Sequence, residues 1–151
     1  MAALLAFLHH LAAFTLVAAV AVEFVLIRGE LSLVSARRLQ ATDAVLGMAV
    51  LLVLVVGLLR VFLFEKGAAY YFHSAPFLVK LGVFIVLVLA SISPTIEFLS
   101  WKGALKQGAV PAVLPAKLRT IRRILHWELA GAVVILLCAA LMARGIGHIG
   151  T

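Results

Sequence analysis

The sequence has few charged residues, and this scarcity excludes a soluble fold. Charged residues make up 13% of the 151 residues and hydrophobic residues 66%, whereas about 25% charged residues are usual in a soluble domain. The mean hydropathy is +1.23. A soluble domain of this size cannot bury so much apolar surface, so lipid must cover the remainder. The sequence therefore predicts an integral membrane protein in contact with a lipid bilayer.

Cysteine and catalytic motifs are equally scarce. The single cysteine, Cys138, lies inside an apolar run, which excludes an intramolecular disulfide. The sequence has no phosphate-binding glycine loop, dinucleotide-binding glycine pattern, nucleophile elbow or zinc-protease motif, so no catalytic residue can be named. The net charge is +7, but the basic residues lie at the ends of the apolar runs and form no patch interleaved with aromatic residues. A nucleic-acid partner is therefore not expected.

Four apolar runs account for most of the chain, at residues 4–27, 44–64, 75–99 and 124–143. Each has the roughly 20 residues needed to cross a hydrocarbon core of about 30 Å. Backbone groups cannot stay unpaired in lipid, so the runs must be helices. We expect one transmembrane domain over residues 1–151, an all-α four-helix membrane bundle. The small residues Gly47, Gly57 and Gly131 are expected to mark close approaches between helices.

The basic residues also predict an orientation. Most of them fall between the first and second runs and between the third and fourth runs, and lysine and arginine favour the cytoplasmic side. We therefore expect both termini outside (N-out/C-out) in a bacterial cytoplasmic (inner) membrane. Residues 102–123 contain two prolines followed by a basic stretch. This pattern predicts a turn and then a surface helix lying against anionic lipid headgroups.

Ionisable side chains inside the spans are expensive, at about 2.5–3.5 kcal/mol each, and so need an explanation. Those predicted in the outer half are almost all cationic, with Glu65 as the one carboxylate: His9, His10, Arg60, His73, Lys80 and, after the last span, Arg144 and His148. Such a set favours an anionic ligand such as a carboxylate, a phosphate, a haem propionate or a lipid headgroup. The alternative for Arg60 and Lys80 is that they extend to the interface from near the span ends.

A second polar group is predicted in the inner half of the bundle, formed by Glu23, Asp43, Glu97, His126 and Glu128. His126 and Glu128 are about 200° apart around a helix, so both cannot face the bundle interior. Pairing of the carboxylates with nearby arginines is one alternative, and extension of Asp43 and Glu97 to the interface is another. No ligand pair has a metal-binding spacing, so no metal site is expected.

Several segments resemble a bacterial family of predicted four-helix membrane proteins with no assigned function. They read GLLRVF at 57–62, EKGAAYYFH at 65–73, KL at 80–81, SPT at 93–95 and ALMARGIG at 140–147. The resemblance covers nearly the whole chain and implies the architecture but no activity.

The layout is also distantly similar to the four-helix haem-b protoporphyrinogen oxidase family and the membrane copper-resistance D family. The shared features are an early histidine (His9 or His10), a basic start to the second span (Arg37, Arg38), the Lys80-Leu81 pair and Glu128. This resemblance implies haem b as a cofactor. The oxidase family has a histidine late in the third span, where this chain reads ASISP at 90–94. A haem would therefore need His73 or His126 as its second ligand, or a single axial ligand.

Three hypotheses for function follow. The first is a redox or cofactor-binding protein that holds haem b or a quinone-like, anionic ligand near His9 or His10, Arg60 and Lys80. The second is a non-enzymatic accessory or assembly subunit of a larger membrane complex. The third is a small proton-linked transporter that uses a polar stripe from His9 to Glu23, which lie on nearly the same helix face. Four spans are few for transport, so the third hypothesis favours a homo-oligomer.

Overall fold

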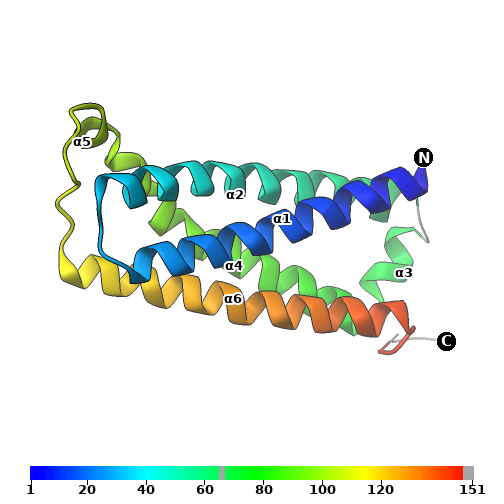
Figure 1. Ribbon diagram of the computed structural model, residues 1–151. Coiled ribbons are helices and arrows are strands. Elements are labelled where there is room, and N and C mark those ends of the chain that lie inside the picture. Colours follow the sequence, from blue (N-terminus) through cyan, green and yellow to red (C-terminus); the bar gives the residue numbers. More distant parts are fainter. Residues whose placement is uncertain (65–66, 148–151) are drawn as a thin grey trace.

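The computed structural model describes residues 1–64 and 67–147, and these form an all-α bundle (Figure 1). The elements are α1 (Ala2–Arg28), α2 (Leu33–Leu59), a π-helical turn η1 (Arg60–Phe64), α3 (Ala68–Phe72), α4 (Ala75–Ser100), α5 (Lys102–Lys106) and α6 (Pro115–Ala143). Within the described ranges, four helical segments are long and apolar enough to cross a membrane: Ala2–Arg28, Leu33–Leu63, Ala75–Lys106 and Pro115–Ala143. The predicted fold class, an all-α four-helix membrane bundle, is confirmed.

Two helices begin earlier than the apolar runs suggested. Helix α2 begins at Leu33 because Ser32 and Ser35 form a capping box: the Ser35 N–H donates to Ser32 Oγ (3.1 Å), and the Ser32 N–H donates to Ser35 Oγ (2.8 Å). Helix α6 begins at Pro115, a residue well suited to the first turn of a helix. The basic stretch expected to be helical within residues 102–123 is helical and forms the first turns of α6, so it is continuous with the fourth span.

The four long helices are arranged in a ring. Helix α1 packs against α2 and α6, and α4 packs against α6 and α2. The first turn of α1, the last turn of α6 and α3 lie at one end of the bundle, which we call the terminal end (Figure 1). The connections at 29–32 and 107–114 and helix α5 lie at the other end, which we call the loop end.

The largest buried core lies toward the loop end and draws on every long helix. It includes Ile27 of α1, Leu39 of α2, Phe98 of α4 and Leu125 of α6, all with at most 2% of their surface exposed. The outer faces carry many exposed apolar side chains from all four helices. Those outer faces suit contact with lipid, which leaves the few buried polar groups as the features that need explaining.

Small residues bring two helix pairs close together, but not at every predicted position. A Cβ added at Gly131 would lie 2.6 Å from Leu87 Cδ1, so α6 and α4 approach closely there. A Cβ added at Gly57 would lie 3.1 Å from His9 Cε1. Nothing lies within 4 Å of a Cβ added at Gly47, so the approach predicted there is wrong.

Candidate functional site

Three carboxyl groups from three helices are buried inside the bundle. They belong to Glu23 of α1, Asp43 of α2 and Glu128 of α6, and their exposed fractions are 0%, 6% and 4%. Glu23 lies close enough to interact electrostatically with both Asp43 and Glu128, and Glu128 interacts in the same way with Asp43. We call these three residues the acidic cluster.

The fourth long helix supplies a hydroxyl group to the acidic cluster. Thr95 Oγ1 of α4 donates a hydrogen bond of 2.7 Å to Asp43 Oδ1. Thr95 follows Pro94, which is fully buried inside α4. The contact between α2 and α4 depends on how the helices are rotated in the bundle, which the sequence alone does not reveal.

Glu23 and Glu128 have no such donor. Within the described residues, none of their four carboxyl oxygens has a hydrogen-bond partner, and all four are buried. The flanking turns are apolar: Ala19 and Ile27 are buried on α1, and Leu125 and Ala132 are buried on α6. The two carboxyl groups are therefore enclosed by the helices and not directed toward an aqueous interface.

The burial of Glu23 and Glu128 limits the charge that their carboxyl groups can carry. An ionised carboxylate in such a place, with no partner, costs several kcal/mol, and neighbouring carboxylates repel one another when both are charged. The described residues contain no group of three or more histidine, cysteine or acidic side chains placed to hold a metal ion. Neutral carboxyl groups avoid both of these electrostatic costs.

The nearby arginines do not neutralise Glu23 and Glu128, so the alternative of arginine pairing is wrong for these two residues. The arginines instead contact the helix ends. Arg37 donates to the carbonyl of Leu105 (3.3 Å), and Arg122 Nε donates to the carbonyl of Ile27 (2.9 Å). The Arg28 guanidinium lies over the Phe24 ring, 5.0 Å from its centre.

Two residues predicted for the inner group lie outside the acidic cluster. Glu97 forms an ion pair of 2.7 Å with Lys117 Nζ and accepts a hydrogen bond of 3.1 Å from Trp101 Nε1. His126 is exposed on α6, with its ring centre 6.2 Å from that of Phe24. Glu97 therefore links α4 to the start of α6, and His126 faces outward.

The cationic residues predicted for the outer half lie toward the terminal end. His9 of α1 interacts electrostatically with Lys80 of α4, with Arg60 of η1 and with its neighbour His10. Its Nδ1 is buried and has no hydrogen-bond partner among the described residues. His10 is exposed, and its Nδ1 lies 2.6 Å from the carbonyl of Ala6, one turn earlier in the same helix.

His73 is separate from this group. Its Nδ1 lies 2.6 Å from the carbonyl of Ala69, again within its own helical turn. In the described part of the chain, no ring contact or hydrogen bond joins His9 to His73 or His126. The described residues therefore give no support for a bis-histidine haem site. Glu65 and His148, which the sequence placed at this level, lie outside the described residues.

Four apolar membrane-length helices around an apolar core with a few buried polar groups define this chain as a small multi-pass membrane protein. The family model described as "Predicted membrane protein (DUF2214)" matches residues 1–147, and the chain belongs to that family. No curated protein and no solved structure matches the chain.

Proposed function

We propose that the protein is a small proton-linked transporter of the bacterial cytoplasmic membrane, in which the acidic cluster is the proton-binding site. The observation that carries this proposal is the complete burial of Glu23 and Glu128 without a hydrogen-bond partner among the described residues. Ionisable residues inside membrane bundles typically mark ion or proton pathways. A carboxyl group that must be neutral while buried binds a proton and releases it when water or a base reaches it.

The members of the acidic cluster have different roles in this proposal. Asp43 accepts the Thr95 hydroxyl hydrogen bond, which fixes its orientation against α4. Glu23 and Glu128 have no donor among the described residues and take up the protons. Because the three carboxyl groups interact, protonation of one changes the proton affinity of the others. Proton uptake is therefore a property of the whole cluster.

His9 is the second polar residue of the proposed proton pathway on the same helix. It lies 14 residues before Glu23, or about 21 Å along α1 at a rise of about 1.5 Å per residue. Its buried Nδ1, which has no partner among the described residues, can accept a hydrogen bond from a water molecule on the proposed pathway. With the termini outside, as the basic loops favour, His9 lies toward the outer surface and the acidic cluster toward the cytoplasm.

Proton flux into liposomes tests this proposal. The purified protein is reconstituted with an internal pH-sensitive dye, and a potassium gradient with valinomycin drives protons inward. Glu23→Gln keeps the side-chain shape but cannot ionise, and we expect it to reduce flux at least tenfold, with Glu128→Gln giving a similar loss. The matched control is Glu30→Gln, which makes the same change at an exposed acid in the loop between α1 and α2. Flux that is equal in wild type, Glu23→Gln and protein-free liposomes would refute the proposal.

The other hypotheses gain no specific support from the geometry. A haem b or quinone-like ligand near His9 predicts an optical signature, so a spectrum of protein purified from native membranes decides that hypothesis. An accessory subunit or a homo-oligomer predicts cross-links in native membranes, whose masses distinguish a partner protein from a second copy of this chain.

A further inference from the structure

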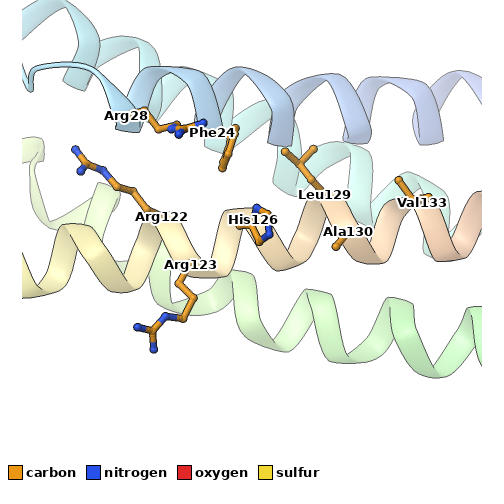
Figure 2. Close-up of a pocket in the computed structure, with 8 residues that line it drawn as sticks. All are labelled: Phe24, Arg28, Arg122, Arg123, His126, Leu129, Ala130 and Val133. Carbon is orange, nitrogen blue, oxygen red and sulfur yellow. The ribbon is translucent and has the colours of Figure 1, made fainter.

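A groove runs between α1 and α6 near the loop end, and none of the three acidic-cluster residues lines it (Figure 2). Its volume is about 920 Å³. We call it the arginine groove and define it by six of its lining residues: Phe24, Arg28, Arg122, His126, Leu129 and Val133. The proposed function uses none of these six side chains.

The charged part of the arginine groove is built from two helices. Figure 2 shows Arg28 of α1 and Arg122 of α6 together at the loop end, with His126 further along α6. Contacts hold both arginines: the Arg28 guanidinium lies over Phe24, and Arg122 Nε donates to the carbonyl of Ile27. Arg123 also borders the groove, but its guanidinium points away from α1 (Figure 2).

No carboxylate balances this charge within the described residues. The ion pair at this end joins Lys117 to Glu97, on the α4 side of α6. Arg122 forms its hydrogen bond through Nε, so its terminal nitrogens can still donate. The guanidinium groups of Arg28 and Arg122 point in opposite directions along the groove (Figure 2), and each can donate paired hydrogen bonds to phosphate oxygens.

The rest of the arginine groove is apolar and leads toward the middle of the bundle. Leu129 and Val133 lie one and two turns beyond His126, and Val133 is 65% exposed. Trp127, adjacent to His126, is 64% exposed. A ligand here meets cations at the interface level and apolar side chains for about 10 Å below it, at a rise of about 1.5 Å per residue.

We propose that the arginine groove binds one anionic phospholipid, with its phosphate on Arg28 and Arg122 and an acyl chain along Leu129 and Val133. The position of the arginines at the end of α1 matches the headgroup level, where anionic lipids attract basic residues. A free phosphate ion would satisfy the arginines but would leave the apolar half of the groove unused, which is why the lipid is the better occupant.

Native mass spectrometry of the detergent-purified protein tests this assignment. The protein receives equal amounts of phosphatidylglycerol and phosphatidylcholine with identical acyl chains. We expect wild type to retain one phosphatidylglycerol, with at least a tenfold preference over phosphatidylcholine. Arg28→Gln should reduce that binding about tenfold, because it removes charge-assisted hydrogen bonds to the phosphate. Val133→Trp should do the same without any change in charge, by filling the apolar half of the groove.

The controls separate a lipid site from general attraction and from a small-anion site. Arg38→Gln removes the same charge from an exposed position on α2 and should leave phosphatidylglycerol binding unchanged. Equal retention of the two lipids by wild type, or an equal loss in Arg38→Gln and Arg28→Gln, would overturn the assignment. The assignment would also be overturned if inorganic phosphate displaced the lipid and Val133→Trp bound phosphatidylglycerol as well as wild type does. Arg28 and Val133 both lie at the helix surface, so these variants test binding without removing the Arg122–Ile27 hydrogen bond.

Discussion

The contact between Gly131 of α6 and Leu87 of α4 gives a sharp test of the helix packing. In a helix, replacing glycine by alanine stabilises by about 1 kcal/mol through backbone propensity. At Gly47, where nothing lies within 4 Å of the new methyl group, that gain is unopposed. We therefore expect Gly47→Ala to raise the free energy of unfolding by up to about 1 kcal/mol.

At Gly131 the same substitution causes a steric clash. The new Cβ would lie 2.6 Å from Leu87 Cδ1 and 2.9 Å from Leu87 Cδ2, whereas carbon atoms in contact normally lie about 3.5–4.0 Å apart. Leu87 must rotate, or α6 must move by about 1 Å, and overpacking of this kind costs about 1–3 kcal/mol. Gly131→Ala should thus be less stable than Gly47→Ala by about 1–3 kcal/mol.

Reversible unfolding in detergent micelles, followed by circular dichroism, measures both variants. Leu87→Ala removes the obstructing methyl groups, so adding Gly131→Ala to it should cost less than adding Gly131→Ala to wild type. A Gly131→Ala protein as stable as Gly47→Ala, or an identical cost of Gly131→Ala in both backgrounds, would refute the close α4–α6 approach. That approach matters for function, because Glu128 lies one turn before Gly131 on the same helix.

Three further predictions follow from single contacts. In detergent, the free energy of unfolding of Glu23→Gln should lie within about 1 kcal/mol of wild type, because glutamine resembles a neutral carboxyl group, whereas that of Glu23→Lys should fall by about 3–5 kcal/mol. Equal losses in the two variants would contradict a buried Glu23 without a hydrogen-bond partner. Ser32→Ala removes the capping side chain of α2 and should cost about 1 kcal/mol in the same measurement. Gly57→Ala brings a methyl group to 3.1 Å from His9 Cε1 and should shift the NMR signals of that imidazole, while Gly47→Ala should not.

The sequence predicts the bundle well and the rotation of its helices poorly, for one physical reason. In water, a helix reveals its buried face by the periodicity of its apolar residues. In a membrane, lipid and core are equally apolar, so that signal is weak. The presence of four membrane-length helices and the position of the basic end follow from composition. Whether Glu97 faces the acidic cluster or Lys117 depends on how α4 is rotated about its axis, and the spacing of the apolar residues does not reveal this rotation.

Polar residues partly replace apolar periodicity as a guide to which face of a helix is buried. The spacing of His126 and Glu128 requires opposite faces, and the structure has Glu128 buried and His126 exposed. The spacing alone does not say which of the two is inside. Glu128 is inside because α6 meets α4 at Gly131, a tertiary contact. The partnership of Asp43 with Thr95 is of the same kind, since it joins two helices that are far apart in the sequence.

The line of contact between α1 and α6, which we call the seam, separates acidic from basic side chains that would otherwise neutralise one another. Glu23 and Glu128 lie on its inner side, and Arg28 and Arg122 lie on its outer side, on the same two helices. Where an acid and a base of this protein do face each other, as Glu97 and Lys117 do, they form an ion pair of 2.7 Å. Glu23 and Glu128 have no such pair, so each side of the seam needs a partner of its own. In the two proposals made above, the enclosed acids take up protons and the open groove binds an anion with an apolar tail. The location of each charge relative to the seam is the observation on which both proposals depend.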